Sequence, residues 1–261
     1  MAKIITFTNQ KGGVGKTTSC INLASFVATY GYKTLVIDMD PQGNASSGLG
    51  IFDKNNKRNI YDVLVDRYDI TDGVIINTNI PLLDIIPTST NLAGAEVELS
   101  RIENNREKIL KDALDKISAN YDFIMIDCPP SLGMLTINSL TACNSILIPT
   151  QCEFFALEGM SQLLFTIKQI KKYLNPDVEI EGILLTMYDK RSKLTINVED
   201  EIKKYFPNKL YETTIPRNVR LAEAPSYGMP IVTYDNKCIG AKAYSDLALE
   251  FLQNNKKKKK R

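Results

Sequence analysis

A glycine-rich segment with two lysines and two threonines follows the first apolar run of the chain. It reads Lys11-Gly12-Gly13-Val14-Gly15-Lys16-Thr17-Thr18 and comes shortly after Ile4-Ile5-Thr6-Phe7. The apolar run predicts a buried strand, and apolar residues at helical spacing after Lys16 predict a helix. N–H groups at a helix N-terminus bind anions, while Lys16 suits β- and γ-phosphates and the Thr17 hydroxyl suits Mg²⁺. The ligand we expect here is a nucleoside triphosphate.

A dinucleotide-binding loop is the main alternative for this segment. Gly13 and Gly15 begin a G-x-G pattern, and Asp38 stands at about the distance of an acid that binds a ribose. The third glycine of that pattern is missing, because Thr18 stands in its place. A lysine followed by a threonine is instead typical of triphosphate-binding loops. The residues therefore favour a triphosphate over a dinucleotide.

Three aspartates follow two apolar runs that we expect to be buried strands. Asp38 and Asp40 come after residues 35–37, and Asp127 comes after residues 123–126. Ligands of open parallel sheets bind at the carboxyl ends of the strands, so these acids are expected to face the phosphates, although paired acids at a strand end can also merely cap a turn. Asp127 has the arrangement that holds Mg²⁺ through a water, and we expect residues 129–133 after it to sense the γ-phosphate.

The order of elements predicts the fold class. Apolar runs such as residues 82–87 and 121–127 alternate with stretches at helical spacing such as residues 106–117. This alternation predicts an α/β fold with a single doubly wound, mostly parallel sheet and helices on both faces. We expect residues 1–252 to form one ATPase domain and residues 253–261 to form a basic, disordered tail.

Composition excludes several classes of protein. The chain has no histidine and no run of about 18 apolar residues. Its five cysteines have no C-x-x-C spacing, so a zinc site or a disulfide framework is not expected, and a reducing cytoplasm fits. The last six residues are all basic, whereas residues 1–255 carry 26 basic and 30 acidic side chains. Any binding of nucleic acid must therefore come from a local patch or from the tail.

Three strings resemble one family of ATPases. The first loop departs from the general P-loop because Gln10 replaces its first glycine and Lys11 opens it; in this it resembles the deviant Walker A motif of the ParA/MinD group. Asp38-Met39-Asp40-Pro41-Gln42-Gly43-Asn44 is similar to the Walker A′ motif of that group. Ile215-Pro216-Arg217-Asn218-Val219-Arg220 resembles the base-binding loop of its Soj type. By these strings, residues 3–251 are identified as a ParA-family chromosome-partitioning ATPase of the Soj type.

The resemblance implies roles in ATP binding and hydrolysis. Lys11 would reach the phosphates bound by a partner subunit, and Lys16 would act on the phosphates of its own loop. Asp40 would orient or activate the attacking water, with Asp38 and Thr17 supporting the Mg²⁺ ion together with Asp127. Pro216 would pack on adenine, and Asn218 would bond to its edge.

The resemblance also implies partners. The family forms homodimers on ATP binding, and Arg191 and Arg220 stand where its DNA-binding arginines are placed. We expect non-specific binding of double-stranded DNA, because phosphate contacts need positive charge but no base-reading helix. Basic residues on loops can also be merely solvated. We also expect slow hydrolysis that a ParB-type partner stimulates. The expected location is cytoplasmic and nucleoid-associated, and no binding to membranes is expected.

Three other functions stay open at this point. A MinD-like, membrane-associated ATPase would end in an amphipathic helix; residues 243–252 are amphipathic, but they run directly into lysines and are predicted to face the core. A nucleotide switch without catalysis would bind ATP and release no phosphate. The nitrogenase iron-protein branch would bind an iron–sulfur cluster through Cys128, but it needs a second cysteine in residues 87–94, where there is none. Cys128 is therefore expected to be a packed thiol.

Overall fold

A seven-stranded sheet forms the centre of the computed structural model of the chain, which describes residues 1–52, 58–153 and 156–258. Its order is β3-β4-β2-β5-β1-β6-β7, and every neighbouring pair is parallel except β3 and β4. The predicted mostly parallel sheet is therefore confirmed. The strands are β1 (Lys3–Phe7), β2 (Thr34–Asp38), β3 (Ile76–Asn77), β4 (Leu83–Ile86), β5 (Phe123–Asp127), β6 (Ser145–Gln151) and β7 (Glu179–Thr186).

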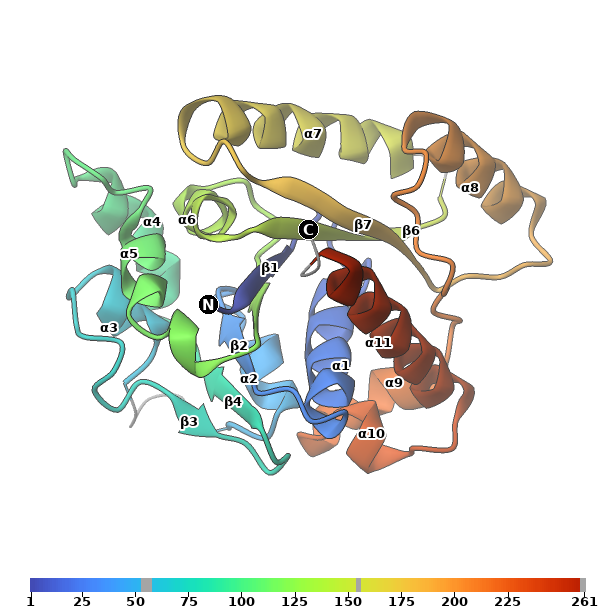
Figure 1. The fold of residues 1–261 in the computed structure, drawn as a ribbon, viewed down its shortest axis with the longest axis horizontal. Helices are drawn as coiled ribbons and strands as arrows, with labels where there is room; N and C mark the ends of the chain where they lie inside the picture. Colours follow the sequence, from blue (N-terminus) through green and yellow to red (C-terminus); the bar gives the residue numbers. More distant parts are fainter. Residues whose placement is uncertain (53–57, 154–155, 259–261) are drawn as a thin grey trace.

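Helices cover both faces of this sheet (Figure 1). One face packs against α1 and α11, and the other packs against α4, α5, α6 and α7. The helices are α1 (Lys16–Thr29), α2 (Asn44–Gly48), α3 (Ile60–Leu64), α4 (Leu92–Ser100), α5 (Ile109–Asp115), α6 (Met134–Ala142), α7 (Ala156–Tyr173), α8 (Lys193–Tyr205), α9 (Val219–Glu223), α10 (Ile231–Tyr234) and α11 (Ile239–Lys258), with two 3₁₀ turns, η1 (Ser118–Asn120) and η2 (Ala224–Tyr227).

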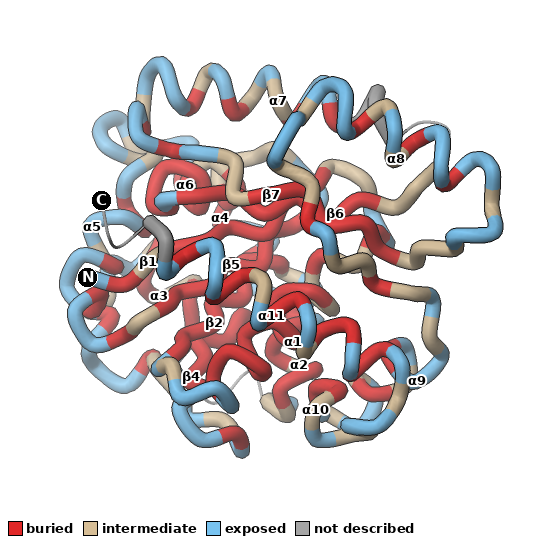
Figure 2. Tube along the Cα trace, turned by 45° about the vertical axis from the view of Figure 1, so that its right-hand side comes forward, coloured by how far each residue is buried: buried red, intermediate tan, exposed pale blue. Residues whose placement is uncertain are grey.

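The central strands are apolar on both faces because both faces are covered. Successive side chains of a strand point to opposite sides. In β2, Leu35 and Ile37 join the core under α4–α7, while Val36 joins the core under α1 and α11. Figure 2 shows these strands as the buried interior, with exposed turns on α7 and α8. This two-sided burial explains why the strands read as continuous apolar runs rather than as alternating ones.

The register of the sheet aligns the strand ends that carry the acids. Phe7 at the end of β1 lies opposite Asp127 at the end of β5, and Asp127 in turn lies opposite Asp38 at the end of β2. The loop before α1 leaves the sheet from the same edge, since β1 lies beside β5. Two buried carboxylates and the glycine-rich loop are thus brought together by strand pairing alone.

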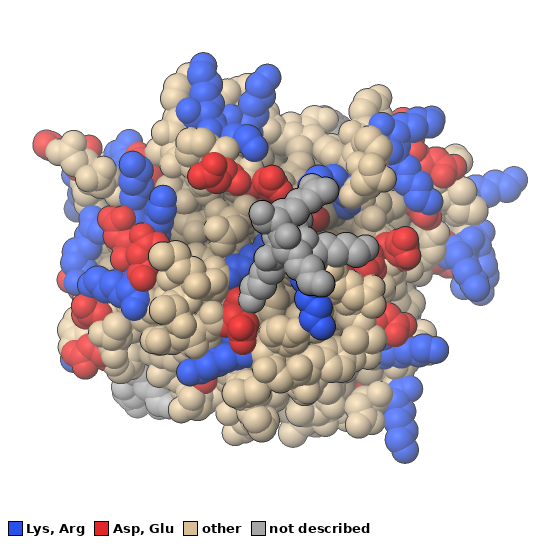
Figure 3. Space-filling model, in the orientation of Figure 1, with Lys and Arg blue, Asp and Glu red and all other residues tan. Residues whose placement is uncertain are grey.

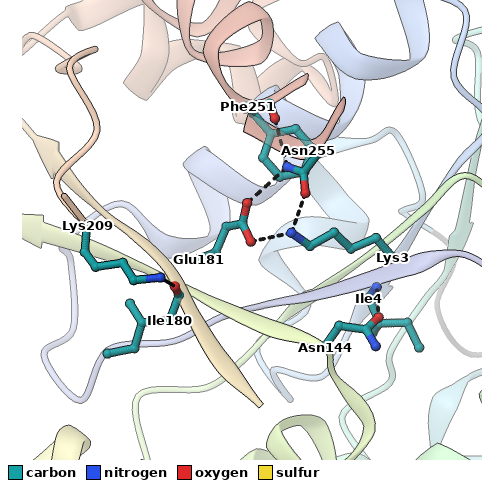
Figure 4. Close-up of polar contacts among 8 residues, drawn as sticks. All are labelled: Lys3, Ile4, Asn144, Ile180, Glu181, Lys209, Phe251 and Asn255. Carbon is teal, nitrogen blue, oxygen red and sulfur yellow. Dashed lines mark hydrogen bonds and ion pairs between the residues drawn. The ribbon is translucent and has the colours of Figure 1, made fainter. Parts of the chain in front are cut away.

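The C-terminal helix extends further than the sequence predicted. Asn255 lies in α11, its side-chain amide donates to Glu181 Oε1 at 3.0 Å, and its side-chain oxygen accepts from Lys3 Nζ (Figure 4). Lys3 Nζ also pairs with Glu181 Oε2 at 2.5 Å, and the Glu181 side chain is 1% exposed. These contacts fix α11 to β1 and β7 beyond residue 252, so the helix continues past the predicted end of the domain and includes the first residues of the predicted tail. The predicted disorder of residues 259–261 lies outside the described residues.

Candidate nucleotide-binding site

The loop before α1 has the backbone of an anion-binding turn. Gly13 has φ +75° and Gly15 has φ +83°, in the left-handed region that favours glycine. Gly15 is the N-cap of α1; it offers no side-chain hydrogen bond, and the first turn of the helix has no acidic residue. The N–H groups at this helix end are therefore available to an anion. Thr186 at the end of β7 supports the loop, since its hydroxyl donates to the Val14 carbonyl at 2.8 Å.

Lys16 is a buried cation in this loop. Only 7% of the residue is exposed, and its Nζ donates to the Lys11 carbonyl at 3.1 Å. Burial lowers its pKa, whereas the charges of Asp127 and Asp40 raise it. The salt bridges of the described residues do not include Lys16. A desolvated ammonium without a carboxylate in contact is suited to an anionic ligand.

The two aspartates at the ends of β2 and β5 differ in their contacts. Asp38 Oδ2 accepts from the N–H and the hydroxyl of Ser46 at 2.8 and 2.7 Å. Burial raises the pKa of Asp38 to about 6, although the bonds from Ser46 oppose the shift. Asp127 is fully buried, and no hydrogen bond of normal geometry from the described residues reaches its carboxylate oxygens, although the nearby Thr17 hydroxyl acts to lower its pKa. Burial, followed by the charge of Asp38, raises the pKa of Asp127 well above its usual value.

The unpartnered oxygens of Asp127 fit a Mg²⁺ site. Mg²⁺ prefers oxygen ligands, keeps several waters and uses one or two carboxylates together with substrate phosphates. Asp127, Asp38 and the Thr17 hydroxyl provide such oxygens. Across residues 1–52, 58–153 and 156–258, no three acidic, cysteine or histidine side chains are grouped closely enough to hold an ion by themselves. An ion at this position would therefore also need oxygens from phosphate and water.

Two adjoining cavities open at the loop. The larger, of about 600 Å³, is lined by Lys16, Thr17 and Asp40, and by Pro130 from the connection after β5. The smaller, of about 220 Å³, is lined by Pro216, Asn218, Thr186, Met187 and Tyr244. Gly13, Gly15 and Thr18 line both. The first cavity suits phosphates, and the second has the apolar walls that suit a base.

The structure places most of the predicted nucleotide-binding residues around these cavities and adds others. Asn218 N-caps α9, because its side-chain oxygen accepts from Arg220 N at 2.8 Å. Its amide NH₂ therefore remains as the group that could reach a base. Thr186 and Tyr244 were missed from the sequence, since neither belongs to a motif. Tyr244 is buried on α11, and its hydroxyl bonds to Ser19 of α1 at 3.1 Å.

Lys11 points to an acid of its own chain. Its Nζ forms an ion pair with Glu153, which follows β6, and about two fifths of each side chain is exposed. Asn9 fixes the backbone at this point, since its side-chain oxygen accepts from Lys11 N at 3.1 Å and its amide donates to the Pro149 carbonyl at 2.8 Å. Lys11 does not line either cavity. The loop thus directs Lys11 away from the phosphates that its own glycines would hold.

The predicted DNA-binding arginines do not share one cavity. Arg191 lines a groove of about 870 Å³ with three other cations, Lys190, Arg217 and Lys242. Its guanidinium is largely exposed and pairs with Asp189 at 3.0 Å. Arg220 does not line this groove and pairs instead with Glu223 at 3.0 Å and Asp235 at 3.6 Å. Figure 3 shows basic side chains projecting over α8 and the loop before it, interspersed with acids.

Two other expectations can be checked from burial. Leu247, Ala248, Phe251 and Leu252 of α11 are buried against the sheet, so the prediction that this amphipathic helix faces the core is confirmed. No helix in the described part of the chain is both long and apolar enough to cross a bilayer. Cys128 is fully buried and burial raises the pKa of its thiol, which confirms the prediction of a packed thiol.

Comparisons with known proteins match the whole chain. A family model described as an AAA domain matches residues 2–180. The chain is 55% identical over 254 residues to the sporulation initiation inhibitor protein Soj of Bacillus subtilis, covering 97% of this chain and 100% of that protein. It is 49% identical over 261 residues to the chromosome partitioning protein ParA of Myxococcus xanthus, covering 100% and 92%. Its fold is similar to cobyrinic acid a,c-diamide synthase from Mycobacterium smegmatis with bound ATP analog and magnesium, with a TM-score of 0.84, 31% identity and coverage of 98% and 96%.

Proposed function

The chain belongs to the ParA/Soj family of chromosome-partitioning ATPases, and from this premise we propose that it is an ATP-dependent, dimerising ATPase. In this proposal it binds DNA without sequence preference and partitions a chromosome or plasmid with a ParB-type partner that stimulates its slow hydrolysis. The observation that carries the proposal is the buried, unpartnered Asp127 beside the buried Lys16 at the glycine-rich loop. Burying a carboxylate and an ammonium that make no ion pair with each other is costly, and a phosphate at Lys16 together with Mg²⁺ at Asp127 would offset that cost.

The nucleotide is expected to lie across the two adjoining cavities. The N–H groups of Gly12 to Thr18 and the Lys16 ammonium bind the phosphates, and Pro216 and Asn218 bind the base. Thr17, Asp38 and Asp127 would hold Mg²⁺, which when bound neutralises charge on the phosphate oxygens. Bound ATP analog and magnesium in the similar synthase structure support this assignment.

Asp40 is the residue that we assign to the attacking water. It lines the phosphate cavity, and its Oδ1 accepts from Gln42 N at 2.9 Å. This bond fixes the carboxylate in the lining of the cavity, while its second oxygen can accept a proton or a hydrogen bond from water. Asp38 is not assigned this role because it is fully buried and does not line the phosphate cavity.

Lys11 is the residue that we assign to pairing. Its side chain points away from the cavities of its own chain, so it can reach phosphates only after a rearrangement or on another molecule. In the closed dimer each Lys11 would contact the nucleotide of the other subunit, as an arginine finger supplied in trans does. The two nucleotides would then hold the two subunits together.

DNA is expected to bind in the groove that holds Lys190, Arg191, Arg217 and Lys242. An exposed ion pair such as Arg191–Asp189 contributes about 0–1 kcal/mol, so a DNA phosphate can replace the Asp189 carboxylate at little cost. Lys190, Arg191 and Arg217 lie outside the helices, and Lys242 lies on α11, which packs against the sheet. Contacts to phosphates alone give binding without sequence preference.

Replacing Asp40 with alanine tests the proposed cycle. We expect Asp40→Ala to bind ATP but not hydrolyse it, so the closed dimer should stay on DNA longer than the parent. Retention is measured by co-sedimentation with linear DNA and ATP over a salt series, where log affinity should fall with a slope of about −0.9 per phosphate contact. Anionic liposomes serve as the second arm. Weaker DNA retention than the parent, or retention on liposomes instead of DNA, would contradict the proposal.

Replacing Glu153 with glutamine tests whether the ion pair with Lys11 opposes pairing. The pair is partly exposed, and both subunits must break it to form the dimer, so its loss should favour the ATP-bound dimer by up to about 2 kcal/mol, or roughly 30-fold in the dimer dissociation constant. Sedimentation over a range of protein concentrations with a non-hydrolysable ATP analogue measures this constant. Glu201→Gln, which breaks an exposed ion pair with Lys204 on α8, is the control. An unchanged or weaker dimer for Glu153→Gln would refute the hypothesis that Glu153 competes for Lys11 with the nucleotide of the other subunit.

A further inference from the structure

The helix that follows the Mg²⁺-binding strand is capped by an acid from another helix. The first turn of α6 has no acidic residue, and its N-cap, Gly133, provides no side-chain hydrogen bond. Glu96 of α4 fills this place: its Oε2 accepts from Met134 N at 2.6 Å, and its Oε1 lies 3.5 Å from Leu135 N. A carboxylate at a helix N-terminus satisfies free N–H groups and interacts favourably with the helix dipole.

The close approach of Glu96, and not the backbone conformation, explains the glycine at position 133. Gly133 has φ −85° and ψ −165°, which any residue can adopt. A Cβ at this position would lie only 2.6 Å from the carboxyl carbon of Glu96. Because the Glu96 carboxylate is the end of a flexible side chain, a methyl group at residue 133 would displace it and leave the backbone in place. Glu96 and Gly133 therefore act as a pair.

The connection between Asp127 and α6 is held at both ends. At its start, Cys128 N donates to the Phe7 carbonyl at 3.2 Å, and at its end Glu96 binds Met134. Two prolines lie between, and the second of them, Pro130, lines the phosphate cavity. Between the two ends, the Ser131 carbonyl accepts from the Thr136 hydroxyl of α6 at 2.6 Å, so the connection is tied to the helix that Glu96 caps.

We propose that Glu96 is a positioning residue, which through α6 holds the connection 128–133 so that Pro130, three residues after Asp127, keeps its place in the lining of the phosphate cavity. The inference rests on the proposed ATPase function. Glu96 can act in this way because α4 is itself fixed, with Leu92, Ala95 and Leu99 buried in the core. Glu98, two residues further on, bonds instead to the Tyr61 hydroxyl at 2.9 Å and provides a matched control.

Glu96→Ala tests this role by the response to Mg²⁺. Loss of the cap should increase the population of connections in which Pro130 is displaced from the cavity proposed to hold the Mg²⁺-bound phosphates, raising the Mg²⁺ concentration at half-saturation of a bound fluorescent ATP analogue and lowering kcat, each by about tenfold. Binding of the analogue in EDTA should not change. Amide hydrogen exchange at Met134 and Leu135 should become faster. The Mg²⁺ midpoint of Glu96→Gln should lie between those of the parent and Glu96→Ala, since its side-chain oxygen still accepts one N–H. Glu98→Ala should leave the Mg²⁺ midpoint at the parent value.

A double-mutant cycle with Gly133→Ala separates this role from a general loss of stability. Gly133→Ala alone should reproduce the Glu96→Ala shift in Mg²⁺ midpoint, and it should add nothing in the Glu96→Ala background. Equal effects of Gly133→Ala in both backgrounds would overturn the pairing. A lower Tm for Glu96→Ala with an unmoved Mg²⁺ midpoint and unmoved exchange would overturn the positioning role. If the parent itself fails to hydrolyse ATP, the proposed function fails, whereas the exchange data still test the contact.

Discussion

Lys11→Ala is expected to abolish ATP-dependent pairing and to lower the rate of ATP hydrolysis by about 10³- to 10⁵-fold, the range that a cation supplied in trans contributes to phosphoryl transfer. The reason lies in the direction of the side chain. Lys11 leaves its own loop toward Glu153 and does not line the phosphate cavity, so its loss should not weaken binding of ATP to the single subunit. Lys11→Ala should therefore leave the affinity of the monomer for ATP unchanged while it lowers the rate of hydrolysis.

Three measurements distinguish this outcome from misfolding. Calorimetry should give a parent-like affinity for ATP with Mg²⁺, sedimentation should show a monomer, and phosphate release should be lost. Lys116→Ala is the matched control, because Lys116 also makes a partly exposed ion pair, with Asp69 at 2.8 Å, and lies on the loop after α5. A Lys11→Ala protein that dimerises with ATP and hydrolyses it at the parent rate would refute the role of Lys11.

Asp127→Asn is expected to lower the rate of ATP hydrolysis and to raise the free energy of unfolding. Without its charge, the side chain should no longer hold Mg²⁺, and kcat should fall by about 10²- to 10³-fold, since a metal at the phosphate is worth several kcal/mol. At the same time the change removes a buried carboxylate that has no hydrogen-bond partner among the described residues. In EDTA and without nucleotide, we expect the free energy of unfolding at pH 7 to rise by about 1–3 kcal/mol.

The stability gained by Asp127→Asn should depend on pH with a definite sign. The folded-state pKa of Asp127 is raised above its usual value of 3.8, first by burial and then by the charge of Asp38. Between these two pKa values the folded state binds more protons than the unfolded state, so the free energy of unfolding of the parent falls as pH rises. The variant lacks this term, and its advantage should shrink as pH falls toward 4. Urea unfolding at several pH values measures it; an advantage that is absent at pH 7, or that grows on acidification, would contradict the assignment.

The sequence predicted those features that depend on local pattern and on sheet geometry. Continuous apolar runs indicated strands covered on both faces, because buried parallel strands have no polar side. Asp38 and Asp127 could be placed together before the structure was known, since the carboxyl ends of neighbouring parallel strands share one edge. For the same reason Lys16 and Thr17, which follow β1, were predicted to lie at that edge.

Contacts between residues far apart in sequence could not be predicted in this way. Lys11 and Glu153 are 142 positions apart, and no periodicity links them. The extension of α11 depends on contacts of Asn255 with Lys3 and Glu181, which compensate for a polar sequence that reads as a tail. Glu96 belongs to no motif of the sequence, and only its distance to Met134 N shows that it caps α6.

The central claim, that each nucleotide is completed by a lysine from the other subunit, can be tested most directly by mixing two inactive variants. Lys11→Ala retains Asp40 but provides no lysine, whereas Asp40→Ala provides the lysine but cannot activate water. In a mixed dimer the Lys11→Ala subunit would receive the lysine of its partner and so have one complete site. One of the two lysine contacts remains in a mixed dimer, so some mixed dimers should form. Random pairing of equal amounts would make about one quarter of all sites active, and hydrolysis should reappear at up to that share of the parent rate. If Lys11 acted on its own nucleotide, neither subunit would have a complete site, and the mixture would stay as inactive as its components.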